Sequence, residues 1–203
     1  MLRSLLFVSI ISLLIACKPE RKLPVYGMEF VKTEAGYDTI INKVAPFEFV
    51  DQKGEVVNNA TFQDKVFITD FFFTSCPSIC PVMTKQMLRV HDAYLDNPTV
   101  TFLSHSIDPD RDNIQKLDAY SGKININTND RWHFVTGEKE AIFDMAEHYM
   151  IVAFADEDVP GGFEHSGYFI LVDKDQQIRG YYDGTSENDV TTLIEDLAVL
   201  LNE

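Results

Sequence analysis

The chain has 203 residues, of which 45% are hydrophobic and 24% charged, and its formal net charge is -15 at pH 7. This length and composition suit one globular domain with a sizeable core. The acidic balance excludes non-specific binding to nucleic acid, because contacts to phosphates need clusters of Lys and Arg.

The N-terminal segment has the layout of an export signal. Arg3 is followed by an apolar stretch from Leu5 to Ala16 and then by Cys17. This stretch is shorter than the roughly 20 residues that span a bilayer, which makes a transmembrane anchor the weaker alternative. We therefore expect residues 1–16 to be a signal peptide that directs the chain out of the cytoplasm.

A lipid anchor is expected where this signal ends. Leu14-Ile15-Ala16-Cys17 resembles the bacterial lipobox, in which cleavage precedes a cysteine that becomes lipid-modified. Cys17 would then begin a membrane-anchored lipoprotein whose folded part lies in the cell envelope, on the periplasmic side. Removal of residues 1–16 takes away one Arg and no acid, so the formal charge changes by one unit from -15 to -16.

Residues 17–45 show no clear hydrophobic pattern and contain two prolines and a glycine early on. This composition predicts a tether followed by an irregular lead-in. The domain itself is expected to cover residues 46–203. It begins with two alternating runs in Phe47–Val57, which flank Gln52-Lys53-Gly54 as the strands of a hairpin flank their turn.

The next two elements place two cysteines at a turn. Lys65–Phe73 is rich in aliphatic and aromatic residues and has no polar face, which predicts a central strand buried on both sides. Apolar residues then recur at helical spacing from Met83 to Tyr94, and Pro81 suits the first helical turn. Cys76 and Cys80 therefore lie between a buried strand and the start of a helix.

Strands and helices alternate in the rest of the chain. Their order is strand, helix, strand, helix, hairpin and helix, over Thr99–Asp108, Asn113–Gly122, Arg131–Gly137, Glu138–Met150, Gly167–Gly184 and Asn188–Leu201. This order favours an α/β fold with a mixed sheet and helices on both faces, which is a thioredoxin-like arrangement.

Cys76 and Cys80 suit three roles: a structural disulfide, a redox couple or a metal site. The N–H groups and dipole at a helix start stabilise a thiolate, which makes such cysteines reactive and good metal ligands. Two cysteines four residues apart across one turn can also point the same way. The structural disulfide is the weakest of the three, because so short a loop restricts the unfolded chain little.

The histidines bear on the choice between redox couple and metal site. Thiolates select Cu(I) and imidazole suits both copper oxidation states, so two cysteines and one histidine suit a copper ion that changes state. Zinc is a weaker candidate, because an open fourth position would indicate catalysis and no general base accompanies the cysteines. His165 is the most suggestive third ligand, since it lies in a glycine-containing loop before a strong strand. His105, late in a central strand, is the second candidate.

Three motifs together resemble the Sco/SenC family. They are FFFTSCPSICPVMT, SIDPDRD and EHSGYFILVDKDQQIRGYYDG, in the family's order, and the resemblance covers about residues 46–201. Members of this family are envelope-anchored proteins of thioredoxin fold that take part in assembling the copper A centre of cytochrome c oxidase. The resemblance implies copper, as Cu(I) or Cu(II), and the copper-binding subunit of the oxidase as partner.

The family pattern assigns copper binding to Cys76, Cys80 and His165. Asp108, in SIDPDRD, matches a family aspartate near the site, although capping of the next helix explains it nearly as well. His105 is retained as a further residue close to the metal.

Two functions from different classes remain open. The first is a copper metallochaperone, a binding protein rather than an enzyme, which delivers copper by ligand exchange. The second is a thiol–disulfide oxidoreductase whose Cys76 and Cys80 reduce the copper-site cysteines of the oxidase. The spacing favours copper binding, because a generic thioredoxin has one residue fewer between its cysteines. The two activities can coexist, since the thiols must be reduced before they bind Cu(I).

We predict that the mature protein begins at Cys17 and is acylated there. Mass spectrometry of the membrane fraction is expected to show a diacylated or triacylated N-terminus, because the apolar stretch ends in a lipobox-like sequence. Cys17→Ser is the matched control and is expected to abolish both cleavage and acylation. An intact Met1 on the wild-type protein would contradict the lipoprotein interpretation.

Overall fold

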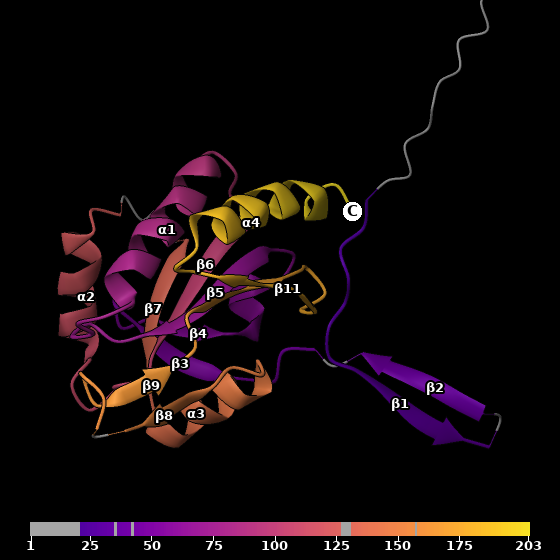
Figure 1. The fold of residues 1–203 in the computed structure, drawn as a ribbon, viewed down its shortest axis with the longest axis horizontal. Helices are drawn as coiled ribbons and strands as arrows, with labels where there is room; N and C mark the ends of the chain where they lie inside the picture. Colours follow the sequence, from indigo (N-terminus) through magenta and orange to yellow (C-terminus); the bar gives the residue numbers. More distant parts are fainter. Residues whose placement is uncertain (1–20, 35, 42, 127–130, 157) are drawn as a thin grey trace, which may run out of the picture.

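A mixed β-sheet with helices on both faces forms the body of the protein, as the computed structural model shows (Figure 1). The structure describes residues 21–34, 36–41, 43–126, 131–156 and 158–203. The sheet strands are β3 Glu48–Asp51, β4 Val56–Asn58, β5 Val66–Phe72, β6 Val100–Ser106, β7 Trp132–Thr136, β10 Tyr168–Val172 and β11 Ile178–Asp183. The helices are α1 Cys80–Ala93, α2 Ile114–Lys123, α3 Lys139–His148 and α4 Glu187–Leu200, and η1 Asn59–Phe62 is a short 3-10 helix.

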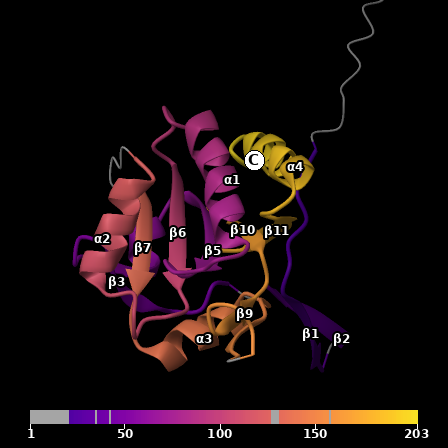
Figure 2. The same cartoon turned by 60° about the vertical axis from the view of Figure 1, so that its left-hand side comes forward.

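The strand order in the sheet is β11-β10-β5-β6-β7-β3-β4. The three central strands β5, β6 and β7 run parallel, whereas β10, β11, β3 and β4 pair antiparallel with their neighbours. Figure 2 shows α1, α2 and α4 over one face and α3 under the other. The predicted α/β fold with a mixed sheet and helices on both faces is confirmed.

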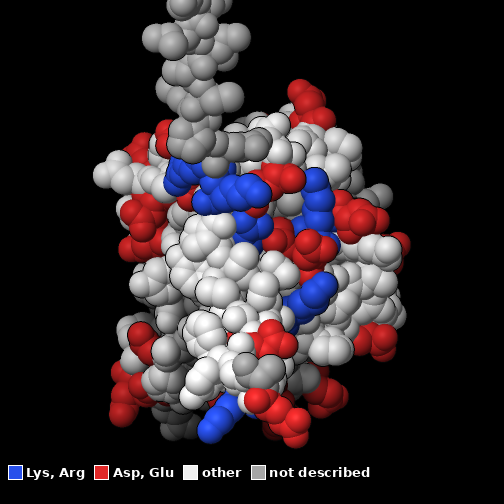
Figure 3. Space-filling model, turned by 90° about the vertical axis from the view of Figure 1, so that its right-hand side faces the viewer, with Lys and Arg blue, Asp and Glu red and all other residues white. Residues whose placement is uncertain are grey.

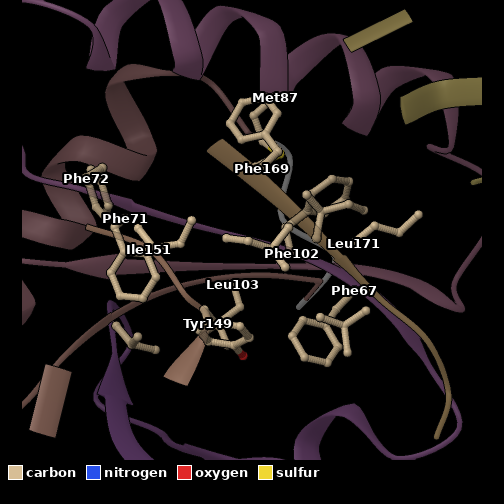
Figure 4. Close-up of a cluster of buried hydrophobic side chains, with 14 of the residues drawn as sticks. Phe67, Phe71, Phe72, Met87, Phe102, Leu103, Tyr149, Ile151, Phe169 and Leu171 are labelled. Atoms are coloured by element: carbon tan, nitrogen blue, oxygen red, sulfur yellow. The ribbon is translucent and has the colours of Figure 1, made fainter. Parts of the chain in front are cut away.

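The core lies in two layers because β5 is buried along its whole length. On one side of the sheet, Met87 of α1 lies beside Phe169 (Figure 4). On the other side, the ring centroids of Phe71 and Tyr149 are 6.1 Å apart. Burial of each such side chain contributes about 1.5–3 kcal/mol to the free energy of unfolding. The core thereby fixes the end of β5, where the turn that carries the cysteines begins.

Residues 28–41 are more regular than the irregular lead-in that the sequence predicts. Met28–Thr33 (β1) and Gly36–Ile41 (β2) form an antiparallel hairpin that extends away from the main sheet in Figure 1. Both strands are exposed at every position. Because neither face of the hairpin is buried, its sequence lacks the alternation of apolar and polar residues that marks a half-buried strand.

A second small hairpin lies in the loop that was expected to carry His165. Ala153–Ala155 (β8) pairs antiparallel with Phe163–His165 (β9), and Ala153 lies opposite His165. The histidine therefore ends a short strand, where backbone pairing restricts its position.

The start of the described chain is held against the last helix by Arg179. Its Nη2 donates to the carbonyl of Leu23 at 2.8 Å, and its Nε donates to the carbonyl of Pro24 at 2.9 Å. The same guanidinium pairs with Asp173 at 2.9 Å and with Glu203 at 2.5 Å. Figure 3 shows basic and acidic side chains intermixed on this face of the molecule.

Arg179→Ala is expected to lower the free energy of unfolding by about 3 kcal/mol. The substitution leaves the carboxylates of Asp173 and Glu203 without their cation, and removing one partner of a buried pair costs about 3–5 kcal/mol. Urea unfolding followed by circular dichroism measures the change. Lys174→Ala is the control, since Lys174 is exposed on the same face and is expected to change the value by less than about 0.5 kcal/mol.

Candidate metal centre

Cys76 and Cys80 lie on the turn between β5 and α1, as the sequence predicts. The N–H of Cys76 donates to the carbonyl of Phe73 at 3.2 Å, so the chain folds back directly after the strand. Helix α1 then begins at Cys80, with Pro81 in its first turn, where no N–H is needed. Cys76 is half-buried, whereas Cys80 is buried between the helix and the sheet.

His165 reaches the cysteines from β9. Its Nε2 lies 3.5 Å from Sγ of Cys80, and its Nδ1 lies 3.3 Å from the carbonyl oxygen of Ser166. A carbonyl oxygen can only accept, so Nδ1 carries the proton of the neutral ring. The lone pair of Nε2 therefore points toward the thiols, which is the orientation that a metal ligand needs.

The structure brings Cys76, Cys80 and His165 together. Their three ligand atoms lie within 4.8 Å of one another, and no other group of three His, Cys, Asp or Glu ligand atoms is so close in the described part of the chain. Sulfur and imidazole ligands about 2.3 and 2.0 Å from one ion lie roughly 3.5–4 Å apart. Two thiolates and an imidazole in this spacing fit a copper ion with little rearrangement.

The two cysteines differ strongly in acidity. A hydrogen bond with the Cys80 thiol lowers the pKa of Cys76 to about 3, against the raising effect of burial, and the backbone N–H groups of Ser78 and Cys80 also act to lower the pKa. The same hydrogen bond, together with burial, raises the pKa of Cys80 well above its ordinary value. Cys76 is therefore the more acidic and more accessible thiol, and Cys80 is the less acidic, buried one.

A buried carboxylate holds the turn that leads to Cys76. Asp112 is fully buried, and its oxygens accept from the Thr74 N–H at 2.8 Å, the Thr74 hydroxyl at 2.5 Å and the Ser106 hydroxyl at 2.7 Å. Sequence analysis missed this role, although Asp112 is the last residue of the SIDPDRD motif.

Asp108 is not one of the three clustered residues. It is buried and forms an ion pair with Arg111 at 2.5 Å, and Arg111 donates to the carbonyl of Gly161 at 2.9 Å. Asp108 is thus linked to the loop between β8 and β9. The alternative role in helix capping is wrong, because the side chain of Asn113 caps α2 by accepting from the N–H of Lys116.

The loop before His165 also packs directly against the cysteine turn. Gly161 has a φ of +98°, and a Cβ at this position would lie 2.7 Å from the ring of Phe73 and 3.2 Å from Pro77. Only glycine therefore allows the two ligand-bearing segments to approach so closely.

His105 lies away from the three metal-binding candidates, on the α3 side of the sheet. It is fully buried, stacks on Phe71 at 4.8 Å between ring centroids, and meets the Thr69 hydroxyl at 3.2 Å through Nδ1. Burial lowers the pKa of His105 to about 4, so the ring is neutral at pH 7. Its described contacts place it in the core rather than beside the cysteines.

Asp70 is a second residue that sequence analysis missed. It lies on β5 inside the apolar run Lys65–Phe73, is 5% exposed, and accepts from the Ser104 hydroxyl at 2.5 Å. Burial raises the pKa of Asp70 to about 6, against the lowering effects of Ser104 and His165. The sequence did contain a signal for Asp70, because it is a single charged residue in an otherwise apolar strand.

A cavity of about 360 Å³ gives access to the thiols. Its lining combines both cysteines with apolar side chains and two lysines: Phe73, Thr74, Cys76, Cys80, Pro81, Thr84, Lys85, Leu88, Tyr120, Lys123 and Ile124. The hydroxyls of Thr84 and Tyr120 lie 2.7 Å apart within it. A reagent or a partner can therefore reach Cys76 without unfolding the turn.

Iodoacetamide is expected to alkylate Cys76 first, at a rate that is nearly constant from about pH 5 to pH 8. The pKa of Cys76 is lowered to about 3, so the thiolate is fully formed across this range. For an ordinary cysteine, with a pKa near 8.5, the rate of alkylation falls about tenfold for each pH unit below that value. Mass spectrometry of the metal-free, reduced protein gives the rates, and Cys76→Ser is the control in which the remaining thiol should react slowly. A rate that fell tenfold per unit in the wild type would contradict the assigned asymmetry.

Comparison with known proteins identifies a family and a fold that the chain shares. A sequence model described as SCO1/SenC matches residues 37–202. A solved SCO1/SenC family lipoprotein from Bacillus anthracis is 28% identical, with 78% of this chain and 95% of that chain covered and a TM-score of 0.72. BsSco, described as a member of the Sco family of cytochrome c oxidase assembly proteins with a disulfide switch, is 26% identical, with 82% and 98% covered and a TM-score of 0.67.

A copper-bound structure has the same fold. It is ScoI of Arabidopsis thaliana, which is 23% identical, with 79% of this chain and 99% of that chain covered and a TM-score of 0.67. The family match includes the cysteine turn, the SIDPDRD segment and the strand of His165. The chain belongs to the SCO1/SenC family.

Proposed function

We propose that this protein is a copper metallochaperone that assists assembly of the copper A centre of cytochrome c oxidase. The observation that carries the proposal is the convergence of two sulfurs and one imidazole nitrogen within 4.8 Å. The copper-bound structure of Arabidopsis ScoI and the description of BsSco as an oxidase assembly protein support it. The oxidase subunit that holds the copper A centre is the proposed partner.

The placement of the ligands suits delivery of copper as cargo. Cys76 and Cys80 come from the turn before α1, whereas His165 comes from β9, so the ligands can be replaced one at a time. Cys76 is the most exposed of the three and lines the cavity. An incoming thiolate of the partner would therefore replace Cys76 first and the buried ligands afterwards.

A second candidate function is reduction of the oxidase copper-site cysteines. The observation that favours it is the pairing of a Cys76 thiolate with a protonated Cys80. In such a reduction the Cys76 thiolate attacks the disulfide of the partner, and one partner thiolate leaves. Cys80 then loses its proton and attacks the Cys76 sulfur, which releases the second partner thiolate and leaves a Cys76–Cys80 disulfide. The disulfide switch described for BsSco supports this chemistry.

We also propose that Cys17 anchors the protein to a membrane of the cell envelope. The assignment of residues 1–16 and 17 falls outside the described residues, so its support is the lipobox-like sequence and the similarity to a solved family lipoprotein. No helix among the described residues is long and apolar enough to cross a bilayer.

We expect the copper-loaded protein to transfer its ion to a reduced, soluble copper-binding domain of the oxidase subunit. Optical and electron paramagnetic resonance spectra of the separated proteins would follow the metal. Cys76→Ser and Cys80→Ser are expected to stop transfer, because each removes a thiolate ligand. His165→Ala is the matched variant: it is expected to weaken copper binding strongly while the cysteines still form and reduce a disulfide.

Retention of wild-type copper affinity by His165→Ala would exclude this histidine as the third ligand. Rapid reduction of the oxidised domain by the metal-free dithiol form, with no copper given up by the loaded form, would decide against delivery. The oxidoreductase would then replace the chaperone.

A further inference from the structure

The cavity beside the thiols is a groove between two helices, α1 and α2, which lie on the same face of the sheet in Figure 2. Four of its lining residues recur at helical spacing on one side of α1, namely Pro81, Thr84, Lys85 and Leu88. The opposite wall comes from the end of α2 and the residue after it, from Tyr120 to Ile124. Because Cys76 also lines the groove, a partner that enters it meets this thiol.

Hydrogen bonds join the two walls and give the groove a fixed shape. The Thr84 hydroxyl donates to the carbonyl of Cys80 at 2.8 Å and lies 2.7 Å from the Tyr120 hydroxyl. A hydroxyl has one hydrogen to donate, so Thr84 accepts from Tyr120. Helix α1 is thereby tied to α2 next to the cysteine turn. A preformed groove of about 360 Å³ can receive a short peptide segment without rearrangement of the fold.

The charge of the groove is opposite to that of the whole chain. Lys85 and Lys123 are exposed and line it, and its described lining residues include no Asp or Glu, although the chain has 32 acidic and 17 basic residues. Within the described ranges, neither lysine takes part in an ion pair. A cation at Lys123 suits the last turn of α2, but Lys85 lies in the second turn of α1, where the helix dipole does not favour one. Both ammonium groups are therefore available to carboxylates of a partner.

Apolar side chains complete the groove. Leu88 lines it from α1 and Ile124 from the end of α2, and each is half-buried, so part of its surface still faces water. An aliphatic side chain placed against them would remove apolar surface from water on both sides of the contact. Ammonium groups and apolar walls together fit a peptide that carries both carboxylates and an aliphatic side chain, whereas an inorganic anion would use only the lysines.

We propose that this groove binds an acidic peptide segment of the partner protein, in which a cysteine is followed by an aliphatic residue and flanked by carboxylates. The carboxylates pair with Lys85 and Lys123, and the aliphatic side chain packs against Leu88 and Ile124. This placement brings the sulfur of the segment to Cys76. The inference rests on the proposed function for the identity of the partner, but the charge and shape of the groove do not depend on copper.

The test compares the disulfides of two synthetic peptides at one pH, with the metal-free, reduced protein. In one peptide a cysteine is followed by leucine and flanked by two glutamates, and in the other glutamine replaces both glutamates. The Cys76 sulfur bonds to one peptide sulfur, the peptide S–S bond breaks, and the second peptide leaves as a thiolate. Mass spectrometry after acid quenching follows the loss of the reduced protein.

The glutamate disulfide is expected to react about tenfold faster than the glutamine disulfide at low ionic strength, at the lower end of the range for electrostatic steering. The net charge of the protein, -15, would by itself give the opposite preference. High salt is expected to bring the ratio of the two rates toward one, because it screens exposed charges.

Replacement of both groove lysines, Lys85→Gln with Lys123→Gln, is expected to abolish the preference for the glutamate disulfide. Lys116→Gln with Lys174→Gln is the matched control, because it removes the same charge from two exposed lysines that do not line the groove. The control is expected to keep the wild-type ratio. All four side chains are exposed, so both double variants are expected to fold, which circular dichroism checks.

A ratio of one or less in the wild type, or a ratio that survives the loss of both groove lysines, would overturn the proposal. Replacing the leucine of the peptide with serine is expected to slow the reaction several-fold. No slowing would assign the groove to small anions and would also overturn it. None of these rates involves copper, so a protein that bound no copper would defeat the chaperone proposal while these rates still tested the groove.

Discussion

The metal centre depends on the buried carboxylate of Asp112. Its hydrogen bonds to the backbone and hydroxyl of Thr74 and to the hydroxyl of Ser106 join the ends of β5 and β6. A carboxylate without these donors would be too costly to bury, and the turn without the carboxylate would leave the Thr74 N–H unsatisfied. Four residues earlier, Asp108 uses Arg111 to hold the loop of Gly161. One short acidic segment thus contacts both chain segments that carry the candidate metal ligands.

The unequal acidity of the two cysteines connects the delivery and reduction hypotheses. A half-exposed thiolate at Cys76 suits the first contact with a partner, whether that partner offers a thiolate for copper or a disulfide for reduction. A buried, protonated Cys80 suits the second step in both cases, because it reacts only after Cys76 is engaged. The same geometry therefore suits both of the proposed chemistries.

The sequence predicted the elements whose hydrophobic pattern is set by burial. The run ending in Phe73 and the helical spacing after Pro81 located the cysteine turn correctly. The β1–β2 hairpin was missed because its strands have no buried face. The glycine-containing loop before a strong strand made His165 the first candidate for the third ligand, and the family resemblance then assigned it, since a loop pattern alone does not show which distant segment it approaches. Asp112 and Asp70 were missed for a related reason: their partners, Thr74 and Ser104, lie on other segments of the chain.

The hydrogen bonds from Arg179 to the carbonyls of Leu23 and Pro24 limit how far the domain can move from its proposed anchor. Six residues, the number from Cys17 to Leu23, span at most about 20 Å. If Cys17 is the anchor, the end of the molecule where α4 stops would be kept close to the bilayer, while β9 and the start of α1 lie toward the opposite end in Figures 1 and 2. A copper ion held there would face outward, at the height of a protein domain that itself stands clear of the lipid.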